Sequence, residues 1–166
     1  FTKESGSGST VAELSQNPAH LFDQGRFQEA ESIYREIVQR NPENPLAYYD
    51  WGLALQALGR YEEAIEAMKA VIRRTPNDSF AHFELGQMQH SQGQFAEAEA
   101  AFRTVIRLDP DDALAYDRLS QTLESQGRMD EAAIAAATAS DLDVANIFCL
   151  REPESCDSSS NPFRRL

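Results

Sequence analysis

One 34-residue pattern runs four times through this chain of 166 residues. Each copy has a glycine, then an aromatic residue (Met129 in the last copy) two positions later and an alanine three positions after that. The four glycines are Gly25, Gly59, Gly93 and Gly127. A repeat of this length indicates a solenoid, because each copy buries its apolar face only by stacking on a neighbour. The extended surface of a solenoid favours holding a ligand over transforming one.

The repeats define a single domain at residues 11–146. Its copies are residues 11–44, 45–78, 79–112 and 113–146, preceded by residues 1–10 and followed by residues 147–166. The Gly- and Ser-rich head has the composition of a flexible linker. The last twenty residues are expected to form a capping segment and a flexible tail.

Each repeat is predicted to form two helices. In the second copy, Asn44 is a good helix N-cap, Pro45 suits the first helical position, and Gly59 suits the turn between helices. Apolar residues recur at three- and four-residue spacing on both sides of that turn, as in amphipathic helices. The two stripes are Tyr48, Trp51, Gly52 and Leu55, then Tyr61, Ala64, Met68, Val71 and Ile72. The sequence therefore predicts an all-α fold of helical hairpins.

Small residues recur where two helices of a hairpin must approach closely. Gly52, Gly86 and Ser120 share one repeat position, and Ala30, Ala64, Ala98 and Ala132 share another. The core stripe of the fourth repeat is predicted to include Leu119, Leu123 and Met129.

These recurring residues resemble the pattern of tetratricopeptide repeat proteins. The matching residues are Tyr48 and Tyr116, Trp51-Gly52 and Leu85-Gly86, the Gly-x-aromatic-x-x-Ala segments, Tyr34 and Phe102, and the closing prolines Pro42, Pro76 and Pro110. The resemblance covers residues 11–146. It implies an α-solenoid of four helical hairpins, with a short capping helix at the C-terminal end and a concave groove lined by the first helix of each hairpin.

The first and last copies depart from the pattern. Asn17-Pro18 replaces the expected Leu-Gly, and Thr10 with Glu13 forms a plausible capping box, so a broken or shortened first helix is expected there. Val144 replaces the closing proline, so the last helix is expected to continue until Pro153 ends it. The apolar residues Ile147, Phe148 and Leu150 would then cover the end of the stack.

A second row of residues on the first helices is the candidate binding groove. Its predicted contact residues are Tyr49, Asp50, Leu53, Phe80, Phe83, Glu84, Gln87, His90, Asp117 and Gln121. Exposed aromatic groups of this kind suggest an interaction site. Leu46 and Phe80 have an alternative role, packing between neighbouring hairpins, which we favour for these two. Tyr49 and Phe83 are expected in the groove.

The charge of the chain limits its partners. The formal net charge is −12, which argues against nucleic acid as a partner. Acidic groove residues also disfavour the C-terminal carboxylate that chaperone-binding members of the family clamp. The expected partner is another protein or peptide segment with apolar anchors and Arg or Lys. No apolar run is long enough to span a membrane.

The end of the sequence leaves two questions open. Cys149 and Cys156 are the only cysteines; they either form a disulfide, which would imply an oxidising compartment, or remain free thiols. The compartment is otherwise unknown. Residues 158–166 are flexible in composition and end in apolar and cationic residues, so self-association through them is an alternative to simple disorder.

No catalytic, metal-binding or cofactor-binding motif is present in the sequence. We therefore expect a non-catalytic scaffold, adaptor or assembly factor. Two alternatives remain: a structural subunit of a permanent complex, or the targeting domain of a larger enzyme whose catalytic part lies upstream of Phe1.

Overall fold

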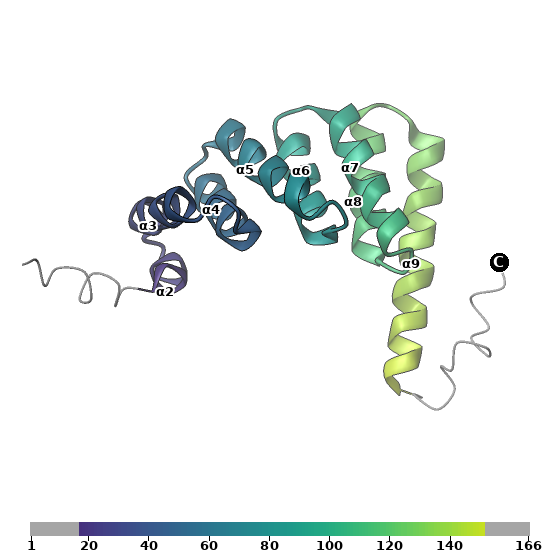
Figure 1. Ribbon diagram of the computed structural model, residues 1–166. Helices are drawn as coiled ribbons and strands as arrows, with labels where there is room; N and C mark the ends of the chain where they lie inside the picture. The colour runs from purple at the N-terminus through teal and green to yellow at the C-terminus, as the bar shows by residue number, and fades with distance from the viewer. Residues whose placement is uncertain (1–16, 152–166) are drawn as a thin grey trace, which may run out of the picture. The chain divides into compact units, whose positions relative to one another are not determined.

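The computed structural model describes residues 17–151, with side chains up to residue 146, and all regular structure in this range is α-helical. The helices are α2 (Pro18–Asp23), α3 (Phe27–Arg40), α4 (Pro45–Ala57), α5 (Tyr61–Arg74), α6 (Ser79–Ser91), α7 (Phe95–Leu108), α8 (Ala113–Ser125) and α9 (Met129–Arg151). Short turns join consecutive helices (Figure 1). The predicted all-α fold of helical hairpins is confirmed.

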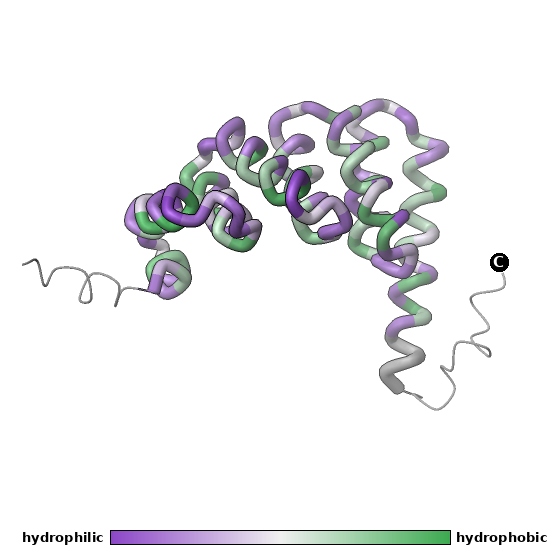
Figure 2. Tube along the Cα trace, in the orientation of Figure 1, coloured by the Kyte–Doolittle hydropathy of each residue, from purple (hydrophilic) through white to green (hydrophobic). Residues whose placement is uncertain are grey.

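The helices form two compact units that divide between Arg74 and Thr75. In the first unit, α2 packs on α3, α3 on α4, and α4 on α5. In the second unit, α6 packs on α7, α7 on α8, and α8 on α9. Hydrophobic and hydrophilic residues alternate along these helices, as packing on one side requires (Figure 2). Each unit therefore contains two consecutive hairpins.

Side-chain caps start the first helix of the later hairpins. Asn44, Asp78 and Asp112 lie 34 residues apart and each accepts a hydrogen bond from a backbone N–H in the first turn, at 3.0–3.1 Å. Asn17 caps the short helix α2 in the same way, at 3.1 Å from the Ala19 nitrogen. Each cap satisfies a donor that has no partner within the helix, which stabilises the helix by about 1 kcal/mol.

The glycine of each repeat makes the turn inside the hairpin. Gly25, Gly59, Gly93 and Gly127 all have φ between 72° and 76°. An added Cβ would meet no atom within 4 Å at any of them, so backbone conformation rather than space requires glycine. The sequence predicted this positive φ correctly.

Helices approach closely at the small residues, as predicted. The four alanines Ala30, Ala64, Ala98 and Ala132 are at most 1% exposed. Ser120 donates a hydrogen bond of 2.8 Å to the Ala132 carbonyl across the α8–α9 hairpin. The core of the second unit gathers around this contact and contains Ala98, Phe102, Leu119, Leu123, Ala132 and Ala135. The core of the first unit contains Leu21, Ala30, Tyr34 and Ala54.

A glutamate at one repeat position joins the two hairpins within each unit. In the first unit, Glu31 is 5% exposed, lies 3.3 Å from Arg60 Nη1 and accepts a hydrogen bond of 3.1 Å from Trp51 Nε1. In the second unit, Glu99 accepts a hydrogen bond of 2.6 Å from Arg128 Nη1. The two glutamates occupy the same repeat position, as do the two arginines. The ion pair is therefore a repeated link between hairpins.

The structure confirms two expectations about the ends of the array. Helix α2 has six residues and begins at Pro18, so the first hairpin has a shortened helix; Thr10 and Glu13 lie outside the described residues. Helix α9 continues past Val144 to Arg151. The side chains of residues 147–151 are outside those described, so their covering role remains a prediction.

Met129 corrects one core assignment. Its side chain is 61% exposed, although its pattern position predicted burial. At the same position Phe27 packs edge-on against Phe22, with ring centroids 5.0 Å apart. The residue five positions before Met129 is Glu124, which offers no ring to pack against. The fourth repeat therefore lacks the ring contact that Phe27 makes at this position.

Candidate functional site

The candidate site is the row of side chains on the first helix of each hairpin, which we call the first-helix row. In the second unit it contains Phe80, Phe83, Glu84, Gln87 and His90 on α6, and Leu114, Asp117, Arg118 and Gln121 on α8. In the first unit it contains Leu46, Tyr49, Asp50 and Leu53 on α4. Three- and four-residue spacing places the members of each helix on one face.

A small cavity of about 230 Å³ opens on this row in the second unit. It is lined by Gln87, His90, Ser91, Phe102, Arg118 and Gln121. Helices α6 and α8 contact each other directly, which brings the predicted residues Gln87, His90 and Gln121 together. The lining is mostly polar, so the cavity suits hydrogen-bonding groups rather than an apolar side chain.

Hydrogen bonds hold several of the cavity side chains in place. Arg118 Nη1 donates to Gln121 Oε1 at 2.9 Å, and Gln121 Nε2 donates to Asp117 Oδ2 at 2.8 Å. His90 Nε2 lies 3.3 Å from Ser125 Oγ. The Nε atom of Arg118 is buried and has no hydrogen-bond partner. Sequence reasoning did not place Arg118 among the candidate site residues.

Two half-buried carboxylates of the first-helix row form no ion pair with any described residue. Asp50 and Glu84 occupy the same position in successive repeats, and burial raises the pKa of each above its usual value. Among the described residues, neither forms an ion pair. Arg118 holds this position in the fourth repeat. The row therefore offers two carboxylates that water solvates only in part.

Exposed apolar side chains recur at another position of the row. Phe80 is 74% exposed, Leu46 is 64% exposed and Leu114 is 50% exposed, and they are 34 residues apart. The favoured packing role for Leu46 and Phe80 is therefore wrong. Each lies in the first turn of its helix, beyond the reach of the hairpin core.

Phe83 is placed differently from what the sequence suggested. Its ring packs edge-on against Phe102 with centroids 5.7 Å apart, and it lies against the core of the second unit. Tyr49, at the same repeat position, is half-buried, as is Leu53. The contacts of Phe83 make it chiefly a packing residue, and Phe80 is the more accessible aromatic group.

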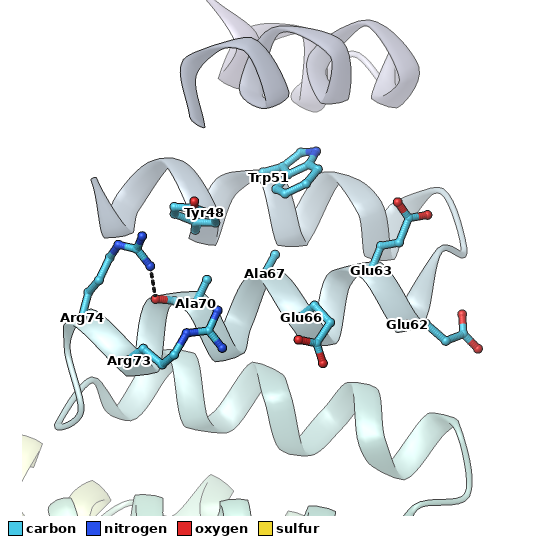
Figure 3. Close-up of a pocket in the computed structure, with 9 residues that line it drawn as sticks. All are labelled: Tyr48, Trp51, Glu62, Glu63, Glu66, Ala67, Ala70, Arg73 and Arg74. Atoms are coloured by element: carbon cyan, nitrogen blue, oxygen red, sulfur yellow. Dashed lines mark hydrogen bonds between the residues drawn. The ribbon is translucent and has the colours of Figure 1, made fainter. Parts of the chain in front are cut away.

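A pocket of about 500 Å³ on α4 and α5 was not predicted (Figure 3). Tyr48 and Trp51 line it, although the sequence assigned both only to the core stripe. The missed signal is the small size of Ala67 and Ala70, which face these aromatic residues from α5. This pocket lies entirely within the first unit.

Other candidate chemistry is limited in the part of the chain that is described. No group of three or more His, Cys, Asp or Glu side chains in residues 17–146 is arranged to hold a metal ion. Among the described helices, none is long and apolar enough to cross a membrane. Cys156 and the side chain of Cys149 lie outside the described part, so their pairing stays a prediction.

The fold and the row define a class of protein, a helical-repeat protein built from consecutive α-hairpins. A sequence profile described as Tetratricopeptide repeat matches residues 20–79, 49–113 and 83–143. The overlapping matches run from residue 20 to residue 143, so the chain belongs to the tetratricopeptide repeat family.

Solved structures of MamA share this fold. One crystal structure of MamA matches with a TM-score of 0.76 at 23% identity, covering 79% of this chain and 77% of that chain. Residues 41 to the end of MamA from Desulfovibrio magneticus RS-1 match with a TM-score of 0.75 at 22% identity, covering 80% and 75%. At these identities the likeness concerns the fold. No curated protein sequence matches the chain.

Proposed function

We propose that the chain is a non-catalytic interaction module that holds a segment of another protein against the first-helix row. The partner segment carries apolar anchors and Arg or Lys. The proposal is supported by membership of the tetratricopeptide repeat family. In this role the chain acts as a scaffold, adaptor or assembly factor.

The half-buried carboxylates carry this proposal. Asp50 and Glu84 have raised pKa values because burial disfavours their charged forms, and neither forms an ion pair within the part of the chain that the structure describes. A partner Lys or Arg would replace the lost solvation with an ion pair. An incoming carboxylate would instead meet like charge at both positions. The row therefore selects cationic segments.

The exposed apolar position supplies anchors next to these charges. Phe80 lies four residues before Glu84 on α6, and Leu46 lies four residues before Asp50 on α4. Residues four apart share one helix face, so each apolar side chain neighbours a carboxylate. A segment with an apolar residue close to a cation would contact both groups.

The cavity between α6 and α8 supplies hydrogen bonds to the backbone of the segment. Gln87 presents a side-chain amide at the cavity. Its N–H group can donate to a peptide carbonyl of the bound segment, and its oxygen can accept from a peptide N–H. This contact holds the segment without reading its sequence.

The test is capture of partners from the native extract by the full chain and by two variants. Phe80→Ser removes an anchor that is 74% exposed, and Ile134→Ser changes a side chain on α9 that is 68% exposed and lies off the row. Both substitutions leave the core untouched. We expect Phe80→Ser to lose the captured proteins and Ile134→Ser to keep them, as read by quantitative mass spectrometry. Equal capture by both variants would refute the proposal.

A further inference from the structure

The pocket on α4 and α5 has the features of a second binding site, separate from the first-helix row. It encloses about 500 Å³, which is within the usual size of ligand pockets of about 300–1,000 Å³. Its walls are mostly apolar, and its lining residues come only from α4 and α5. Figure 3 shows Tyr48 and Trp51 on α4 above Ala67 and Ala70 on α5.

Charged side chains fix the two aromatic side chains of the pocket. Trp51 donates its indole N–H to Glu31 Oε1 at 3.1 Å, and Glu31 is itself held by Arg60. The guanidinium of Arg74 lies over the Tyr48 ring, 4.6 Å from its centroid. A ligand therefore meets rings that are already ordered, which reduces the entropic cost of binding.

Small residues on α5 create the space in front of these rings. Ala67 is 2% exposed and Ala70 is 4% exposed, so neither side chain reaches across the pocket. The ring centroids of Tyr48 and Trp51 are 6.4 Å apart and tilted by 59°. An aromatic side chain of a ligand fits such a surface, because aromatic rings pack favourably in edge-on and offset arrangements.

The rim of the pocket is acidic at one end and basic at the other. Glu62, Glu63 and Glu66 line the end formed by the start of α5, and Arg73 and Arg74 line the other end. The carboxylate of Glu63 is engaged by Arg60, just before α5, and that of Glu66 by Lys69 on α5. Glu62 has no hydrogen bond or ion pair among the described residues. It therefore remains available to a cation of the ligand.

The chain contains a segment with the matching chemistry. Pro162-Phe163-Arg164-Arg165-Leu166 places an aromatic residue beside two cations, and it follows the described part of the chain by more than ten residues. We propose that the α4–α5 pocket binds residues 161–166 of this chain, with Phe163 against Tyr48 and Trp51 and the two arginines toward the acidic end of the pocket, where Glu62 lies. The proposal depends on charge complementarity and on the aromatic surface, and not on the first-helix row.

Trp51 allows a direct test, because it is the only tryptophan in the chain. In the full chain, Phe163→Ser should expose the indole, seen as a red shift of its emission and stronger quenching by acrylamide. The control is Phe80→Ser, because Phe80 is in the second unit. This variant should leave the emission wavelength and the acrylamide quenching of Trp51 unchanged. Unchanged Trp51 signals in the Phe163→Ser chain would overturn the proposal.

A peptide of residues 158–166, added to the Phe163→Ser chain, measures the affinity of the site. We expect saturable reversal of the Trp51 shift. Glu62→Lys should then weaken binding about 3- to 10-fold, as expected for reversal of one exposed charge. The control is Asp130→Lys, an equal charge change at the same repeat position in the second unit. Equal weakening by both, or no binding of the peptide, would refute the assignment.

Exchanging the charges of Glu62 and Arg164 distinguishes a direct contact between these two residues from a general effect of charge. In the full chain, Glu62→Lys and Arg164→Glu should each expose Trp51, and the double variant should restore its shielding. If a partner captured through the row shifts Trp51 while the peptide does not, the pocket serves that partner and the proposal is wrong. Loss of capture by Phe80→Ser tests the proposed function alone.

Discussion

Gly52 and Gly86 occupy one repeat position, yet replacing each with alanine should affect stability differently. A Cβ at Gly52 would lie 2.7 Å from Met68 Cε, which ends a flexible, unbranched side chain. A Cβ at Gly86 would lie 2.8 Å from Phe102 Cε1 and 2.9 Å from its Cζ. The Phe102 ring is 1% exposed and belongs to the core of the second unit, so it cannot turn away.

Two opposing contributions determine the size of each effect. Alanine is favoured over glycine inside a helix by about 1 kcal/mol. At Gly52 a small rotation of Met68 relieves the clash, so the net change should lie within about 0.5 kcal/mol of zero. At Gly86 overpacking against a fixed ring costs about 1–3 kcal/mol. The net loss there is about 0–2 kcal/mol after the helix preference of alanine is subtracted.

Thermal unfolding of the two variants, followed by circular dichroism, measures the difference. For a chain of this size about 1 kcal/mol corresponds to about 2–4 °C, so Gly86→Ala should melt below Gly52→Ala, by up to about 8 °C. Urea unfolding of the same proteins checks that the order holds at a fixed temperature. If Gly86→Ala melts at or above the temperature of Gly52→Ala, the reasoning about the rigid Phe102 ring is wrong.

Four further predictions concern charged groups and the end of the chain. Burial alone would raise the pKa of Glu99, but hydrogen bonds from Gln126, Arg103 and Arg128 outweigh it and lower the pKa. Glu99 therefore stabilises the fold above its unfolded pKa of about 4.3 and loses this effect as the pH falls, and Glu99→Gln should flatten the acid limb of a stability–pH curve. Burial, with the charges of Asp50 and Asp23, raises the pKa of Tyr34 to about 12. The free energy of unfolding should therefore fall as the pH rises above about 10, the pKa of tyrosine in the unfolded chain. In urea titrations, Tyr34→Phe should show a smaller fall over the same pH range. The raised pKa of Glu84 means that its charge opposes folding at neutral pH, so Glu84→Gln should raise the urea midpoint at pH 7 and leave it nearly unchanged at pH 3. Removal of residues 147–166 should lower the melting temperature, and an unchanged value would show that these residues do not cover the end of the stack.

The sequence predicted the helices well because their limits depend on local chemistry. Asn44, Pro45 and Gly59 act on their own backbone, so their roles are readable without knowledge of tertiary packing. The six-residue helix at Pro18 and the continued helix past Val144 followed from the same kind of local signal.

Side-chain packing between helices was harder to predict. Phe83 lies at a row position, but the glycine at position 86 allows the Phe102 ring to approach α6, and Phe83 packs on that ring. The α4–α5 pocket depends on space left between Trp51 and Ala67, which a stripe pattern does not reveal. The ion pairs of Glu31 and Glu99 left a usable signal, because both the glutamates and their arginines recur 68 residues apart.

Selection of peptides from a random library by the full chain tests the central claim most directly. The account predicts enrichment of segments with an apolar residue close to Arg or Lys. Binding of those peptides should weaken when Asp50→Asn and Glu84→Gln remove the charges of the row. The control is Glu97→Gln, which removes an exposed charge from α7, off the row. Enrichment of acidic segments, or peptides whose affinity is unchanged in the Asp50→Asn, Glu84→Gln double variant, would contradict the account.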